Sequence, residues 1–168
     1  LKLINDLEPN RKHIVVVAQE DGSIEDPKPK DLYAYGTLAQ VLKVFDMPDN
    51  SKSAIVQGIS RVKILDYLEL DPYFVAAIEA LEDDPVKDEL ALEALVSNLR
   101  KSFEELMHVA PALTEEHTGM LRNIQKPNRL TDRAISLINT SNQEKQEILE
   151  ELNIKNRIEK ALTLISRE

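Results

Sequence analysis

Residues 36–59 read GTLAQVLKVFDMPDNSKSAIVQGI, and this stretch decides the fold of the first half of the chain. Its two ends, 36–45 and 53–59, are rich in apolar and β-branched residues, and the turn cluster Met47 to Lys52 separates them. Apolar runs on either side of such a cluster are typical of a β-hairpin. Both faces of the first run would be mostly apolar, which indicates a sheet that is covered on both sides or rolled up.

Another strand and a loop are expected before this hairpin. Residues 13–19 (HIVVVAQ) predict a buried strand, closed by a turn in which Gly22 can take a positive φ. Residues 26–31 (DPKPKD) are expected to form a surface loop, because proline has no N–H to donate to a strand ladder.

Apolar residues alternate again after the hairpin. Four of them share one parity: Val62, Ile64, Leu68 and Leu70. This alternation predicts a half-buried strand, and residues 73–81 predict a fifth strand. The first half of the chain is therefore expected to consist of strands joined by turns.

The second half of the chain changes to a helical period. After residue 85, apolar residues recur at helical spacing as far as Met107, which predicts a helix of about six turns. Thr114 can cap a second helix that ends at residues 126–128. A third apolar stripe covers residues 130–138.

Two further helix starts can be read from their caps. Ser141 followed by Glu144 forms a capping box, and Asn153 can cap a last helix. The change of hydrophobic period predicts an α+β chain, with a β-rich part over residues 1–82 and an all-helical part over residues 83–168.

Composition excludes several classes of protein. The chain has 168 residues, 30 acidic and 21 basic side chains and a net charge of -9, which is the wrong sign for a protein that binds nucleic acid. The absence of cysteine excludes disulfides, thiol nucleophiles and cysteine-ligated zinc. With neither a long apolar run nor a charged and apolar leader, we expect no contact with a membrane and a cytoplasmic location.

Motifs that carry chemistry are missing from the sequence. The four glycines cannot form GxxxxGK[ST] or GxGxxG, and no serine stands in GxSxG. His13, His108 and His117 lack the HExxH spacing of a zinc site. Adjacent carboxylates such as Glu150 and Glu151 point about 100° apart on a helix and do not converge on one atom. We therefore predict no catalytic, cofactor-binding or metal-binding residue in this chain.

Exposed apolar residues are the remaining functional signal. Met47 lies at the predicted hairpin tip, and Leu32, Tyr33 and Tyr35 follow the proline loop. Apolar groups at such places can receive unfolded segments or a partner protein. The alternative is that the tyrosines pack over the edge of the sheet and Met47 folds back on it.

Several stretches, in this order, resemble the amino-terminal domain of Lon-type ATP-dependent proteases and the helical extension that follows it. They are VVVAQED (15–21), DLYAYGTLA (31–39), QGISRV (57–62), YFVA (73–76), LTDRAI (130–135), EKQEILE (144–150) and RIEK (157–160). Each stretch alone is a weak signal, but the ordered set covers nearly the whole chain. The resemblance implies a small, partly open β-barrel-like subdomain followed by a helical subdomain.

The resemblance also implies a function. In that family this region helps to select unfolded or damaged proteins and supports assembly of a hexamer, while ATP and Mg are used by other parts of the parent serine protease. No cofactor is expected in this chain itself. Family members usually begin with another strand that carries a Phe-Pro-Gly-like turn, whereas this chain begins in what resembles the next helix, so we expect an excised fragment.

Two other hypotheses remain open at this point. A stand-alone adaptor or ligand-binding protein could use the same fold without a motor. An enzyme in its own right is the third hypothesis, and it lacks a candidate residue. The continuation of the chain beyond residue 168 would separate the first two.

Overall fold

The computed structural model describes residues 2–7, 12–49, 51–110 and 113–168, apart from the side chains of Asn5, Glu115, His117 and Thr118. The chain divides into two compact units, which we call the β unit (Leu1–Glu82) and the helical unit (Asp83–Glu168). The prediction of an α+β fold is confirmed.

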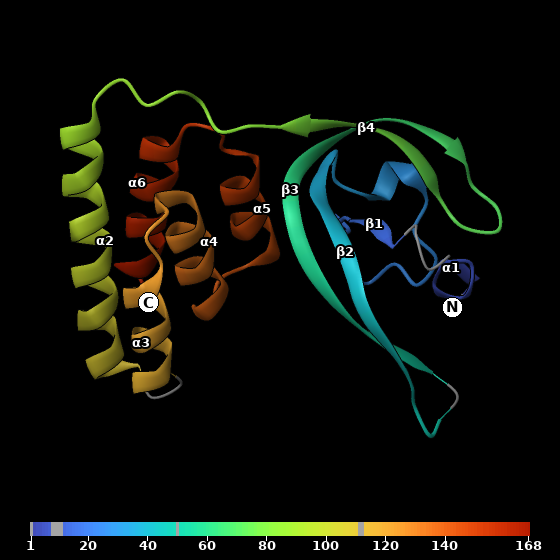
Figure 1. Ribbon diagram of the computed structural model, residues 1–168, viewed down its shortest axis with the longest axis horizontal. Coiled ribbons are helices and arrows are strands. Elements are labelled where there is room, and N and C mark those ends of the chain that lie inside the picture. Colours follow the sequence, from blue (N-terminus) through green and yellow to red (C-terminus); the bar gives the residue numbers. More distant parts are fainter. Residues whose placement is uncertain (1, 8–11, 50, 111–112) are drawn as a thin grey trace. The chain divides into compact units, whose positions relative to one another are not determined.

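The β unit contains one four-stranded antiparallel sheet with the order β1-β2-β3-β4 (Figure 1). Its elements are α1 (Lys2–Asn5), β1 (His13–Val16), a 3-10 turn (Pro29–Asp31), β2 (Tyr35–Asp46), β3 (Lys52–Glu69) and β4 (Val75–Leu81). Strands β2 and β3 form the predicted hairpin. The predicted loop over residues 26–31 is present, with the 3-10 turn at its end.

Strand β1 is an edge strand, and the prediction that it is buried is wrong. It spans only His13–Val16 and pairs on one side, with residues 37–40 of β2. The turn that follows it is also built differently from the prediction, because no glycine has a positive φ. Instead, the Asp21 carboxylate accepts hydrogen bonds from the Ser23 backbone N–H and hydroxyl, at 2.9 and 2.7 Å.

Glycine is needed where β1 pairs with β2. A Cβ atom at Gly36 would lie 2.6 Å from the carbonyl oxygen of Val16, and a backbone atom cannot give way as a flexible side chain would. Gly36 is therefore needed for the close approach of the two strands and not for a turn.

Strand β3 runs unbroken for 18 residues, where the sequence pattern predicts two strands. Register shifts interrupt its pairing with β4 between Ile64 and Asp66 and again between Tyr67 and Glu69. Each inserted residue reverses the alternation of side chains, so Leu68 is 63% exposed although Val62 is buried. The predicted common face of Val62 and Leu68 is therefore wrong, and the described sheet has four strands instead of five.

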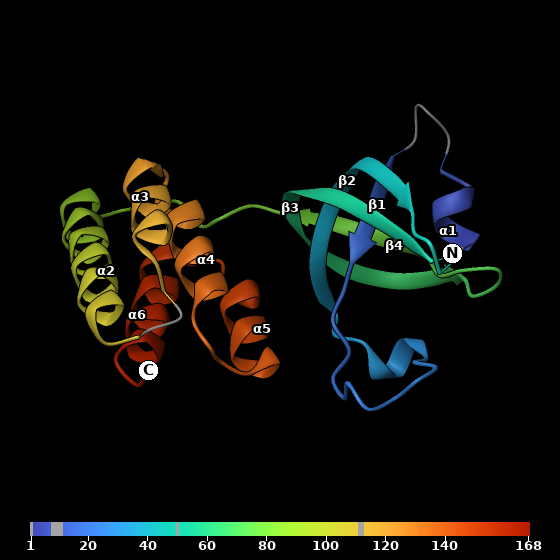
Figure 2. The same ribbon diagram turned by 90° about the horizontal axis from the view of Figure 1, so that it is seen from below.

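The described residues of the helical unit form five helices, and α6 lies between α2 and α4 (Figure 2). They are α2 (Glu89–Val109), α3 (Glu115–Asn123), α4 (Pro127–Leu137), α5 (Asn142–Glu150) and α6 (Ile154–Ile165). Apolar side chains from all five helices form its core, with Phe103, Leu130, Ala134 and Ile158 almost completely buried. Helix α2 has the predicted length of about six turns.

The helix ends follow from local sequence. The caps predicted at Ser141 and Asn153 are confirmed, because Ser141 forms a capping box with Glu144 and Asn153 accepts from the N–H groups of Lys155 and Asn156. The cap predicted at Thr114 stays a prediction. Pro127 begins α4 rather than ending α3, since proline fits the first helical turn. The Arg100 guanidinium donates to the carbonyls of Leu121 and Ile124, both at 2.6 Å, and so caps the end of α3.

Glu144 makes the helical unit sensitive to acid. Hydrogen bonds from the Thr140 hydroxyl, the Arg167 guanidinium and Ser141 lower the pKa of its carboxyl from 4.5 to about 2. A carboxyl with a lowered pKa stabilises the fold above its unfolded pKa and loses that contribution as the pH falls towards the folded one. Glu144→Gln is therefore expected to lower the thermal midpoint at pH 6 and to flatten its fall between pH 4.5 and pH 2.

Thermal unfolding followed by circular dichroism at several pH values measures this effect. Glu159→Gln removes the same charge from an exposed position of α6 and is the matched control. Equal pH profiles for the Glu144→Gln variant and the unmodified chain would contradict the assignment to Glu144.

Candidate functional site

The β2–β3 hairpin extends beyond the other two strands of the sheet (Figure 1). Strand β1 pairs with residues 37–40 of β2, and β4 pairs with β3 only from Arg61 onward. We call the remaining part, residues 42–59, the hairpin arm. Within the described chain, the strands of the arm pair only with each other.

The hairpin arm exposes six large apolar side chains: Leu42, Phe45, Met47, Ile55, Val56 and Ile59. Phe45 and Ile55 share one face of the arm, because Phe45 pairs with Ser53 and Lys43 pairs with Ile55. The Lys43 ammonium lies 4.8 Å from the centre of the Phe45 ring on that face. An exposed apolar surface of this kind marks a place where another polypeptide can bind.

The tip of the arm is fixed by short hydrogen bonds. The Met47 N–H donates to the Ser51 carbonyl at 2.9 Å, and the Asp49 carboxylate accepts from the Ser51 N–H and hydroxyl. These bonds to Ser51 lower the pKa of the Asp49 carboxyl. Met47 is 44% exposed at this tip and does not fold back into a core.

The other three sequence-predicted contact residues lie at the opposite end of β2. Leu32, Tyr33 and Tyr35 are half-buried, and the Tyr33 N–H donates to the Ala18 carbonyl at 3.0 Å. At roughly 3.3 Å per strand residue, Tyr35 and Met47 are up to about 40 Å apart along β2. The structure thus divides the four residues between two places, and their roles as contacts stay predictions.

A groove lies between the two edge strands of the sheet. It has a volume of about 740 Å³ and is lined by residues of α1, β1, β3 and β4, together with Leu32 and the β3–β4 turn. The Tyr67 hydroxyl is buried there without a hydrogen-bond partner among the described residues, and this burial raises the pKa of Tyr67. Desolvation and the neighbouring Asp6 carboxylate raise the pKa of Tyr73 in the same region.

Sequence reasoning missed most of the hairpin arm. The apolar residues of 36–45 predict a sheet that is covered on both sides or rolled up, yet Leu42 and Phe45 are exposed while Ala39 and Val41 are buried. The missing information is where the neighbouring strands stop, since pairing with β1 ends at Gln40. One signal was available in the sequence. The first run of the predicted hairpin, residues 36–45, is longer than the preceding predicted strand, residues 13–19, so part of it could be expected to lack a partner on that side.

Two features are absent from the part of the chain that the structure describes. No group of three histidine, aspartate or glutamate side chains among its residues could hold a metal ion. Across the same residues, none of the helices is both long and apolar enough to span a bilayer.

An α+β chain with an uncovered apolar arm on its sheet has the features of a protein-interaction domain. The family model of the ATP-dependent protease La (LON) substrate-binding domain matches residues 1–167, so the chain belongs to this family. The resemblance inferred from the sequence is therefore confirmed.

Individual Lon proteases match the whole chain. The Lon protease of Anaeromyxobacter dehalogenans (strain 2CP-C) is 36% identical over 168 residues, covering 100% of this chain and 20% of that protein. The Lon protease of Koribacter versatilis (strain Ellin345) is 36% identical over 169 residues, covering 100% and 21%. The chain thus spans about a fifth of the length of these relatives.

The fold is shared with a solved structure. The N-terminal domain of the Mycobacterium avium complex Lon protease superposes with a TM-score of 0.68, covering 91% of this chain and 90% of that one. Its sequence identity is 18%, so this likeness concerns the fold alone.

Proposed function

We propose that the hairpin arm receives unfolded or damaged polypeptides for a Lon-type ATP-dependent protease. The observation that carries this proposal is the exposure of six large apolar side chains on an arm whose outer edges pair with no described strand. Unfolded proteins differ from folded ones in exposing apolar side chains and unpaired backbone groups. The arm offers both kinds of complementary surface, and an extended segment can add to a free strand edge.

Weak binding suits this role. A few apolar side chains that are partly buried on contact supply only modest affinity, which allows release to a motor that pulls the polypeptide away. Several copies in one assembly would raise retention through avidity without any new contact. A hexameric parent, as the resemblance implies, would present six arms.

The parent protein is proposed to supply the chemistry. Membership of the family and the names of the relatives support an ATP-dependent protease, and a parent of that kind would use ATP and Mg outside this chain. Serine peptidase chemistry and assembly as a hexamer remain proposals that rest on the family resemblance. A cytoplasmic location remains a proposal that rests on the composition of the sequence.

The test compares two pairs of substitutions in the 168-residue chain. The arm variant is Phe45→Ser with Ile55→Ser, and the control is Leu65→Ser with Leu68→Ser, exposed residues of β3 outside the arm. The probe is a reduced and carboxymethylated polypeptide that cannot fold, and binding is measured by fluorescence anisotropy. Two half-buried contacts are worth about 1.4 kcal/mol or more, so the arm variant is expected to weaken binding about tenfold.

Circular dichroism checks that each variant keeps its fold. An arm variant that binds the probe as tightly as the unmodified chain would remove the arm from the proposed function. Met47→Ser and Tyr33→Ala, compared in the same assay, decide between the arm and the other end of β2 as the place of contact.

A further inference from the structure

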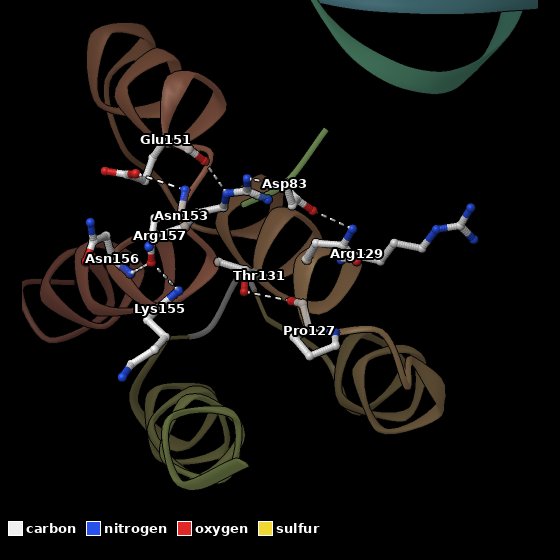
Figure 3. A network of polar contacts seen from close by, with 10 residues as sticks. Asp83, Pro127, Arg129, Thr131, Glu151, Asn153, Lys155, Asn156 and Arg157 are labelled. Atoms are coloured by element: carbon white, nitrogen blue, oxygen red, sulfur yellow. Dashed lines mark hydrogen bonds and ion pairs between the residues drawn. The ribbon is translucent and has the colours of Figure 1, made fainter. Parts of the chain in front are cut away.

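Arg157, on α6, is the only charged residue among the described ones that is buried, with an exposed fraction of 0% (Figure 3). Its Nε–H donates to the Glu151 carbonyl oxygen at 2.7 Å, and one terminal nitrogen forms an ion pair with the Asp83 carboxylate. The other terminal nitrogen is buried and has no partner among the described residues. A buried guanidinium is costly, so its ion pair with Asp83 is a strong constraint on the position of both groups.

Asp83 is also held from a second helix. The Asn128 side-chain N–H, on α4, donates to the other carboxylate oxygen of Asp83 at 2.8 Å. The next residue is fixed through its backbone, because the Asp84 N–H donates to the Leu152 carbonyl at 3.0 Å. We call Asp83, Asn128 and Arg157 the boundary clamp.

The boundary clamp lies at the first residue of the helical unit. Strand β4 ends at Leu81, so Glu82 alone separates the sheet from the clamped residue. Beyond Asp84, the next fixed point is Asp88, whose carboxylate caps α2 by accepting from the Ala91 N–H at 3.0 Å. Without the clamp, residues 82–87 would form a continuous tether.

We propose that the boundary clamp shortens the tether between the two units and makes Glu82 their hinge. With the clamp closed, only one residue is free to change its backbone dihedral angles. With the clamp open, and the Asp84–Leu152 hydrogen bond lost with it, six residues (82 to 87) are free. The span of a flexible chain grows as the square root of its length, which gives an increase of about 2.4-fold. The proposal does not depend on what the β unit binds.

A short tether has a mechanical consequence. Whatever the β unit holds stays within a small volume around the helical unit, and its local concentration there rises as the tether shortens. Loss of the clamp would enlarge that volume without changing a single residue of the hairpin arm. The clamp is thus a positioning device that acts through the backbone at the boundary.

Double electron–electron resonance tests the proposal in the 168-residue chain. The chain has no cysteine, so Gln40→Cys on β2 and Glu159→Cys on α6 place one spin label in each unit at exposed positions. In the labelled chain with an intact clamp we expect a narrow distribution of distances. Asp83→Ala is expected to widen that distribution by up to about 2.4-fold, the growth of the tether itself. Asp84→Ala, which removes the same charge but keeps its backbone bond, should leave the distribution unchanged.

Three results would overturn the proposal. They are a wide distribution with the clamp intact, an unchanged width after Asp83→Ala, or equal widening by Asp84→Ala. Should Asp83→Ala fail to fold, Asn128→Ala opens one half of the clamp without leaving the buried guanidinium unpaired and should still widen the distribution.

Hydrogen exchange of the unmodified chain gives a second measurement. The Asp84 amide is expected to exchange at least about tenfold more slowly than the Lys87 amide, because only a closed clamp keeps Asp84 on the Leu152 carbonyl. Equal exchange at the two amides would show that the clamp is open and would overturn the proposal.

Discussion

Replacing Phe103 by alanine is expected to lower the thermal midpoint of the helical unit by roughly 12–40 °C. Phe103 lies on α2, is 1% exposed and belongs to the core shared by all five helices. Loss of a buried phenyl ring costs about 3–5 kcal/mol, because the transfer energy is lost and a cavity remains. In a unit of this size, 1 kcal/mol corresponds to about 4–8 °C.

Spectroscopy can follow the two units separately. All four tyrosines, Tyr33, Tyr35, Tyr67 and Tyr73, belong to the β unit, while most of the helix belongs to the helical unit. Phe103→Ala should therefore shift the ellipticity transition at 222 nm and leave the tyrosine fluorescence transition in place. Leu90 lies on the same helix but is 78% exposed. Leu90→Ala should therefore change the free energy of unfolding by no more than about 0.5 kcal/mol.

Equal shifts of both transitions would mean that the two units unfold as one. An unchanged ellipticity midpoint would mean that Phe103 is less important to the core than its burial indicates. Either result is readily told apart from the expected one, since the two signals come from different parts of the chain.

Local signals in the sequence predicted the helical unit well. The caps at Ser141 and Asn153 depend on residues two or three positions away, and the apolar period of α2 depends on its own turns. Such features require no knowledge of distant parts of the chain. The starts of α5 and α6 and the length of α2 were therefore predictable, whereas the start of α4 at Pro127 was mistaken for the end of α3.

Features that depend on pairing between strands far apart in the sequence could not be predicted from local signals. The bulges of β3 arise from its register with β4, and they expose Leu68, which simple alternation assigns to the interior. The exposure of the hairpin arm depends on where β1 and β4 stop pairing. Met47 alone was predicted there, because a turn beside a proline is a local signal.

The boundary clamp shows the same limit. Asp83 and Arg157 are 74 positions apart in the chain, and no local pattern links them. From the sequence, Arg157 is one of several charged residues on an amphipathic helix, and Asp83 is one of three consecutive acids. Only the packing of α4 and α6 around the first residues of the helical unit brings the two charges together.

Arg157→Ala is expected to destabilise the helical unit by about 3–5 kcal/mol. The substitution removes the side chain that holds Asp83 and the Glu151 carbonyl, and it leaves space in a buried region. Asp83→Ala is expected to cost a similar amount for a different reason, because a guanidinium with no exposed surface would lose its charge partner. Urea unfolding followed at 222 nm measures both variants.

Combining Asp83→Ala with Arg157→Met separates stability from the clamp. The double variant has no unpaired buried charge, and methionine fills most of the space of the arginine stem, so it should recover at least about 2 kcal/mol relative to Asp83→Ala. The distance distribution between the two units should nevertheless stay wide, because nothing holds residue 83 in place. Arg157→Met alone completes the comparison. If the loss of stability in the double variant equals the sum of the losses in Asp83→Ala and Arg157→Met, the ion pair contributes no coupling. Recovery of both stability and a narrow distribution would show that packing, rather than the charge pair, fixes the hinge.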